Sequence, residues 1–114
     1  MFNNTENKSI WNNGKFVKWD ESLVHLMSHT LNYGTGAFEG VRAYKTSNGP
    51  AIFRLNDHTD RLFNTAKKID IDIPFSKEAL NNVQKEIFIK NNLDEGYIRP
   101  IVYLGAESLG IRAF

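Results

Sequence analysis

The stretch FEGVRAYKTSNGPAIFRLNDHTDRLFNTAKKI, residues 38–69, decides the fold class because it predicts two strands and a helix in direct succession. The run from Phe38 to Tyr44 has strand character, with side chains that alternate between two faces. The turn signal Ser47-Asn48-Gly49-Pro50 follows it and leads into a second apolar run at Ala51–Arg54. We therefore expect an antiparallel hairpin here.

A helix is expected directly after this hairpin. Asn56 is a good N-cap, and apolar residues then recur at helical spacing: Leu62, Phe63, Ala66 and Ile69. The helix is predicted from about Asp57 to Lys68. A second amphipathic helix is predicted after Pro74, because Ser76 can cap it, and it is expected to end near Asn91-Asn92. Its apolar positions are Leu80, Val83 and Ile87.

Strands are also predicted on either side of these elements. In SIWNNGKFVKW, Asn13-Gly14 separates two short apolar runs and favours the positive φ angles of a tight hairpin turn. The run YIRPIVYL, residues 97–104, has one apolar face, whereas the other face includes Tyr97 and Arg99. Pro100 cannot donate to a strand ladder, so this strand is expected to lie at an edge or to be kinked there.

Together these elements predict one α+β domain over residues 1–114, with two helices packed on a mostly antiparallel sheet. A chain of 114 residues has the usual size of a single domain. Its end, IVYLGAESLGIRAF, is apolar and punctuated by glycine, with no polar tail. We expect that the chain was cut inside a larger protein.

The composition is that of an ordinary globular protein, with 41% hydrophobic residues, 24% charged residues and a net charge of +1. Basic and acidic residues are balanced and form no basic block, so no nucleic acid is expected as a partner. The chain has no cysteine, which excludes disulfides and thiol catalysis and makes the cytoplasm the expected compartment. Neither a signal peptide nor a membrane span is expected.

The strand around FEGVRAY is a candidate ligand surface, because alternation places an aromatic residue, a glycine and an arginine on one face: Phe38, Gly40, Arg42 and Tyr44. Glu39, Val41 and Ala43 fall on the other face. A glycine inside a strand often marks close approach by a ligand or by another backbone. The alternative is a β-bulge with no ligand.

Three further groups of residues could carry chemistry. Tyr97 and Arg99 point to one side of their strand and could receive a carboxylate, or they could be a plain surface pair. Arg61 follows His58 by one helical turn and could hold a phosphate, although Asp57 is a possible ion-pair partner instead. The histidines 25 and 29 have the spacing of a helical metal pair, but no third ligand is evident and no metal site is expected.

In combination, these segments resemble the N-terminal region of bacterial branched-chain amino-acid aminotransferases, which belong to fold type IV of the pyridoxal-phosphate enzymes. The resemblance covers nearly the whole chain, from IWNNGKFVKWDE to YLGAESLGI. Its most specific pieces are VHLMSHTLNYGTGAFEGVRAY, RLNDHTDRLFNTAKKI and EGYIRPIVYLG, in the order that the family uses.

The resemblance implies roles for five residues. Arg61 would bind the phosphate of pyridoxal 5'-phosphate, and Tyr33 and Phe38 would line the substrate side-chain pocket. Tyr97 would lie near the substrate α-carboxylate, and Arg99, with Tyr33, would receive the distal carboxylate of glutamate. The lysine that holds the cofactor would lie beyond residue 114, so the chain alone is expected to be inactive and to contain no catalytic residue.

The activity implied is transfer of an amino group between leucine, isoleucine or valine and 2-oxoglutarate, in a homo-oligomeric parent enzyme. One alternative is another fold type IV enzyme, such as a D-amino-acid aminotransferase or an aminodeoxychorismate lyase. A second alternative, from a different class, is a non-catalytic module that binds a small anion or a partner protein.

Overall fold

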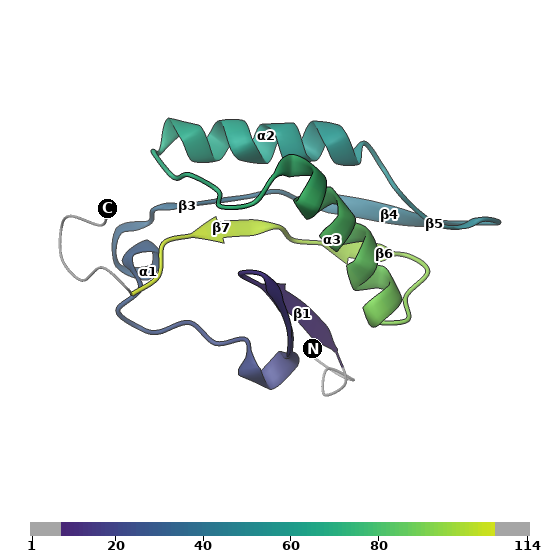
Figure 1. The fold of residues 1–114 in the computed structure, drawn as a ribbon, viewed down its shortest axis with the longest axis horizontal. Helices are drawn as coiled ribbons and strands as arrows, with labels where there is room; N and C mark the ends of the chain where they lie inside the picture. The colour runs from purple at the N-terminus through teal and green to yellow at the C-terminus, as the bar shows by residue number, and fades with distance from the viewer. Residues whose placement is uncertain (1–7, 107–114) are drawn as a thin grey trace.

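A computed structural model describes residues 8–106 of the chain. The elements follow one another in the order β1 (Ser9–Asn12), β2 (Lys15–Lys18), a short 3-10 helix η1 (Trp19–Glu21), α1 (His29–Tyr33), β3 (Gly36–Phe38), β4 (Val41–Thr46), β5 (Gly49–Ile52), α2 (Leu55–Lys68), α3 (Lys77–Lys90), β6 (Gly96–Ile98) and β7 (Ile101–Tyr103). The predicted α+β class, with two main helices and antiparallel strand pairing, is confirmed (Figure 1).

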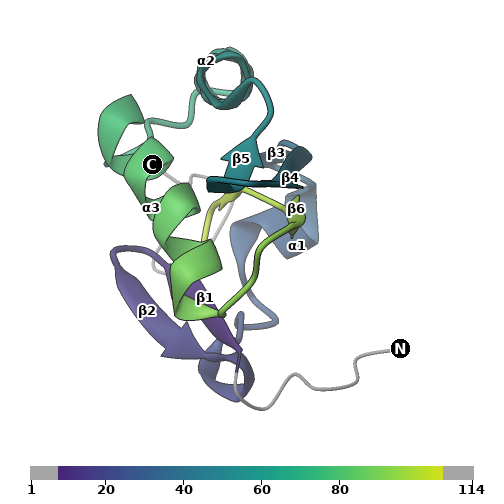
Figure 2. The ribbon, with the colours of Figure 1, turned by 90° about the vertical axis from the view of Figure 1, so that its right-hand side faces the viewer.

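The core lies between α2 and the strands that run beneath it (Figures 1 and 2). One stripe of α2 is buried, with members about one turn apart: Leu55, Thr59, Leu62 and Ala66. The buried side chains of the strands include Ala37, Val41 and Ala43. These small side chains let the helix approach closely, and removing the apolar surface from water stabilises the arrangement.

Strand pairing divides residues 8–106 into three small antiparallel sheets rather than one continuous sheet. The single strand predicted from Phe38 to Tyr44 is in fact two strands, because the ladder is interrupted at residues 39 and 40. The strand predicted over residues 97–104 is interrupted opposite them, at Arg99 and Pro100. β3 pairs with β7, whereas β4 pairs with β5 and β6.

The interruption follows from Pro100, as its missing N–H predicts. Its carbonyl oxygen still accepts a hydrogen bond from the N–H of Glu39, at 3.0 Å. The strand is thus interrupted at Pro100, and the flanking strands β6 and β7 both lie at sheet edges, so the edge alternative of the prediction is confirmed. Alternation also survives the break: Glu39, Val41 and Ala43 are buried, whereas Phe38 on the other face is exposed.

The second hairpin and the helix after it begin earlier than predicted. β5 starts at Gly49 instead of residue 51, and Ser47 and Asn48 form the turn. α2 starts at Leu55, and the residue before it, Arg54, has a left-handed backbone with φ of 52° and gives no side-chain cap. Asn56 is therefore inside the helix instead of capping it, and its side chain accepts a hydrogen bond from the Asn81 side chain at 2.8 Å. Ile69, predicted on the apolar face, follows the helix and is exposed.

The boundaries of α3 agree with the prediction. The Ser76 hydroxyl caps the helix by accepting a hydrogen bond from the N–H of Ala79 at 3.0 Å. The helix ends at Lys90, with Asn91 as its C-cap. Its buried residues are Gln84 and Phe88, while the predicted apolar positions at 80, 83 and 87 are half-buried.

The N-terminal hairpin forms as predicted and is attached to the end of α3. Asn13 and Gly14 have φ values of 49° and 98°, which the tight turn requires. The Asn91 side chain binds the backbone of Ser9 twice: its Oδ1 accepts from the N–H at 2.7 Å, and its Nδ2 donates to the carbonyl at 3.0 Å. The Trp11 ring meets Phe75 edge-on, at 4.9 Å between centroids.

No helix was predicted from the sequence at α1. The first N–H groups of this short helix, at His29 and Thr30, donate to the carbonyl oxygens of Gly105 and Leu104 at 3.1 and 3.2 Å. No helix within residues 8–106 is both long and apolar enough to span a membrane. The prediction that the chain was cut inside a larger protein depends on residues 107–114, which lie outside the described residues.

Candidate functional site

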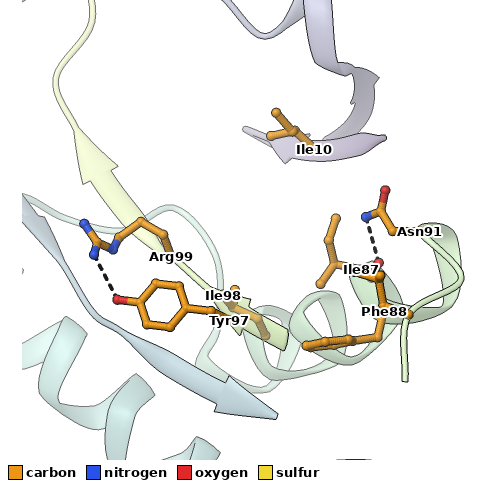
Figure 3. Close-up of a pocket in the computed structure, with 8 residues that line it drawn as sticks. Ile10, Ile87, Phe88, Asn91, Tyr97, Ile98 and Arg99 are labelled. Carbon is orange, nitrogen blue, oxygen red and sulfur yellow. Dashed lines mark hydrogen bonds between the residues drawn. The ribbon is translucent and has the colours of Figure 1, made fainter. Parts of the chain in front are cut away.

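Phe38, Tyr97 and Arg99 lie together on the face of the strands that points away from α2. We call these three residues the Arg99 cluster. The Arg99 Nη2 donates a hydrogen bond to the Tyr97 Oη at 2.9 Å (Figure 3). The guanidinium carbon lies 4.3 Å from the centroid of the Phe38 ring and 5.5 Å from that of Tyr97. The aromatic faces attract the cation and restrict its position.

Gly40 makes room for this cluster. A Cβ at this position would lie 2.3 Å from the Tyr97 Oη, a separation that real Cβ contacts essentially never show, and 3.1 Å from its Cζ. The glycine therefore marks a close approach, but by a side chain instead of the ligand or the backbone that the sequence hypothesis named. The approaching group is the phenol of Tyr97.

The Arg99 cluster has the chemistry of a carboxylate receptor. Both aromatic rings are more than half exposed, and the guanidinium keeps N–H donors that the phenol does not use. A separate hollow of about 220 Å³ with largely apolar walls lies on the other side of the same strand, between Ile98, α3 and Ile10, and the Tyr97 ring and the Arg99 guanidinium point away from it (Figure 3). Its lining residues are Ile10, Ile87, Phe88, Asn91, Leu93, Tyr97, Ile98 and Arg99.

A second group of charged residues lies between α2 and the strand below it. The Arg61 Nε and Nη2 donate to the two carboxylate oxygens of Glu39 at 2.8 and 2.7 Å. His58 Nδ1 lies 3.0 Å from the Glu39 Oε1. The Glu39 side chain is 5% exposed, whereas that of Arg61 is 67% exposed. The buried carboxylate thus holds one edge of a guanidinium whose other edge reaches solvent.

The ion pair changes the pKa of both partners. Hydrogen bonds from Arg61 lower the pKa of Glu39, against the opposing effect of burial, and His58 lowers it further. The same hydrogen bonds from the carboxylate raise the pKa of Arg61. The alternative that Arg61 pairs with Asp57 is wrong, because Asp57 accepts a hydrogen bond from the Arg54 Nε at 2.8 Å.

The structure does not bring all the predicted site residues together. Glu39 and Phe38 point to opposite faces of the chain, so Arg61 and the Arg99 cluster lie on opposite sides of it. Tyr33 is exposed at the end of α1, and its ring contacts that of His29 at 4.6 Å between centroids. The cofactor and substrate roles of these residues stay predictions.

The two histidines with metal-pair spacing do not lie on one helix. His25 is in the loop before α1, where its Nδ1 accepts from the N–H of Met27 at 3.0 Å. The Nδ1 of His29, the first residue of α1, lies 2.7 Å from the Thr35 hydroxyl. Residues 8–106 contain no group of three side chains that could hold a metal ion.

Glu39 was not predicted as a site residue, although the sequence carries a signal for it. Alternation placed Glu39 on the same face as Val41 and Ala43. A carboxylate on a buried apolar face needs a charged or hydrogen-bonding partner, because isolated burial of its charge is very costly. Arg61 and His58, one turn apart on the next helix, are the basic groups that provide it.

Comparisons with known proteins agree with these features. The model of the amino-transferase class IV family matches residues 36–114. The branched-chain-amino-acid aminotransferase of Pseudomonas aeruginosa is 48% identical over 104 residues, covering 91% of this chain and 34% of the relative. The enzyme of the same name from Escherichia coli K12 is 40% identical over 102 residues, covering 90% of this chain and 33% of the relative. The chain thus spans about a third of the length of these relatives.

Solved structures agree as well. The crystal structure of the T.th. branched-chain amino acid aminotransferase, complexed with N-(5'-phosphopyridoxyl)-L-glutamate, matches with a TM-score of 0.89 and 44% identity, covering 95% of this chain and 37% of that one. The Escherichia coli enzyme matches with a TM-score of 0.89 and 38% identity, covering 94% of this chain and 35% of that one. The resemblance inferred from the motifs is thereby confirmed, and the chain belongs to the class IV aminotransferase family.

Proposed function

We propose that residues 1–114 are the small N-terminal domain of a branched-chain-amino-acid aminotransferase. The full-length enzyme would move an amino group between leucine, isoleucine or valine and 2-oxoglutarate. The observation that carries the proposal is the Arg99 cluster, in which a guanidinium, a phenol and the Phe38 ring lie together on one exposed face. Such an enzyme must accept an aliphatic side chain and the distal carboxylate of glutamate in turn, and an exposed aromatic ring next to a guanidinium and a phenol suits both.

In this proposal the Arg99 cluster receives substrate carboxylates. Arg99 supplies N–H donors, and the Tyr97 phenol lies 2.9 Å from it, so a carboxylate can accept hydrogen bonds from both. Phe38 orients the guanidinium by lying under it, 4.3 Å away, and contributes apolar surface for leucine. Tyr33, whose exposed ring lies at the end of α1, would add a second aromatic ring to the side-chain pocket of the full-length enzyme.

Arg61 would hold the phosphate of pyridoxal 5'-phosphate, the cofactor proposed for the enzyme. The residue fits this task because Glu39 takes its Nε and one Nη, while the other edge of the exposed guanidinium can bind phosphate oxygens. The cofactor supplies the electron sink for amino-group transfer. The lysine that binds it would belong to a part of the enzyme outside these 114 residues.

The proposal is tested by assaying the purified full-length protein with pyridoxal phosphate. Transamination of L-leucine with 2-oxoglutarate is expected, with little or no activity on D-alanine. Activity on D-alanine instead would indicate a D-amino-acid aminotransferase, and absence of transamination would reject the proposal. A parallel assay of residues 1–114 alone is expected to show no activity.

Two expectations about the full-length enzyme stay predictions. A homo-oligomer is expected, and sedimentation velocity of the purified enzyme tests this. The cytoplasm is the expected compartment, and assay of leucine aminotransferase activity after cell fractionation tests that.

A further inference from the structure

We propose that Glu39 is a positioning residue that fixes the Arg61 guanidinium in the orientation needed to bind the cofactor phosphate. This inference rests on the proposed function, because it takes the phosphate as the ligand of Arg61. In this proposal Glu39 makes no contact with the cofactor. It acts only by holding the Arg61 guanidinium in place.

The pairing geometry leaves Arg61 ready for a second anion. Glu39 accepts hydrogen bonds from the Nε and the Nη2, which form one edge of the planar guanidinium. Among residues 8–106, no group forms a hydrogen bond with the edge made by Nη1 and the outer hydrogen of Nη2, and 67% of the side chain is exposed. A long arginine side chain loses considerable rotamer freedom when it binds a ligand, and an existing bidentate contact reduces that loss.

Glu39 is itself held firmly enough to act as a support. Its side chain is 5% exposed, and it belongs to the chain segment directly beneath α2. His58 lies 3.0 Å from the Oε1 that also accepts from Arg61, so two consecutive turns of α2 converge on one carboxylate. The lowered pKa of Glu39 keeps it ionised and able to accept these hydrogen bonds at neutral pH.

A carboxylate beside the phosphate site could instead weaken phosphate binding, since both anions are attracted by one cation. The structure favours positioning because the two anions would use different edges of the guanidinium. Glu39 is buried on the α2 side, while the unused edge faces solvent, where water screens the repulsion between the two anions. The two effects predict opposite outcomes for a neutral replacement at residue 39.

The test compares pyridoxal phosphate with pyridoxal, which lacks the phosphate, in binding titrations followed by the visible absorbance of the full-length apoenzyme. In Glu39→Gln we expect the preference for the phosphorylated form to fall about tenfold, equivalent to ~1.4 kcal/mol. Pyridoxal itself should bind as in the wild type. Asp57→Asn is the matched control, because it neutralises an exposed partner of Arg54 on the same helix, and its preference should not change.

An unchanged or increased preference in Glu39→Gln overturns the inference, and so does an equal loss of affinity for both ligands, which would indicate a general effect on folding. Arg61→Ala separates this inference from the proposed function. If Arg61→Ala lowers the preference while Glu39→Gln does not, the positioning role alone is rejected. If Arg61→Ala leaves the preference intact, the proposed phosphate role of Arg61 is rejected, and the inference with it.

Discussion

Replacing Gly40 by alanine tests whether the Arg99 cluster depends on the position of the Tyr97 phenol. The added Cβ would lie 2.3 Å from the phenol oxygen, so an ordinary contact of about 3.4 Å requires a displacement of about 1.1 Å. Tyr97 is exposed and can move, so the free energy of unfolding should fall by less than about 1.5 kcal/mol, the contribution of one hydrogen bond. A displacement of this size in a binding group can cost about 100-fold in rate.

We therefore expect Gly40→Ala to reduce kcat/KM for transamination between leucine and 2-oxoglutarate by about 10- to 100-fold in the full-length enzyme. Gly49→Ala is the control, since that glycine has φ of 103° and no atom near its missing Cβ, so it should lower stability without affecting the rate. In a Tyr97→Phe background, Gly40→Ala should reduce kcat/KM much less, because the phenol oxygen that makes the closest contact is absent. An equal reduction of kcat/KM in both backgrounds, or a Gly40→Ala enzyme with wild-type kcat/KM, would contradict this prediction.

Three further changes give separate tests. Arg99→Lys should raise KM for 2-oxoglutarate about tenfold, because a lysine lacks the planar guanidinium that lies over Phe38. Steady-state kinetics measure this, and an unchanged KM would contradict the prediction. Leu62→Ala should lower the free energy of unfolding by about 2–5 kcal/mol in urea titrations, because Leu62 is 3% exposed. The control is Asn64→Ala at an exposed position of the same helix, which should change the free energy of unfolding by less than about 0.5 kcal/mol. Because Arg61 lowers the pKa of Glu39 below its ordinary 4.5, the stabilisation from this carboxylate should be complete above pH 4.5 and lost as the pH falls through the lower folded value. Urea titrations between pH 2 and 7 should show a steeper acid loss in the wild type than in Glu39→Gln, and parallel curves would contradict the assignment.

The parts of the fold that depend on neighbouring residues could be predicted from the sequence. The turn at Asn13-Gly14, the Ser76 cap and the strand interruption at Pro100 each follow from the backbone chemistry of one or two residues. Strand alternation also predicted correctly that Phe38 and Glu39 face opposite ways.

The parts that were missed depend on distant contacts. α1 has N–H groups satisfied by carbonyls of residues 104 and 105, so nothing within its own five residues identifies it. α2 begins at Leu55, without a side-chain cap, after a residue in the left-handed region, whereas the local signal pointed to Asn56. The partner of Arg61 was assigned wrongly for the same reason: Asp57 is close in sequence, but only the docking of α2 on the strand brings Glu39 to it.

The most direct test of the proposed site is a crystal structure of the full-length protein with pyridoxal phosphate and 2-oxoglutarate bound. We predict that phosphate oxygens lie about 2.7–3.2 Å from the Arg61 guanidinium, with Glu39 still on its other edge. A carboxylate of the oxo acid should lie at a similar distance from Arg99 or the Tyr97 hydroxyl. A phosphate held without Arg61, together with a substrate that touches neither Tyr97 nor Arg99, would contradict the account.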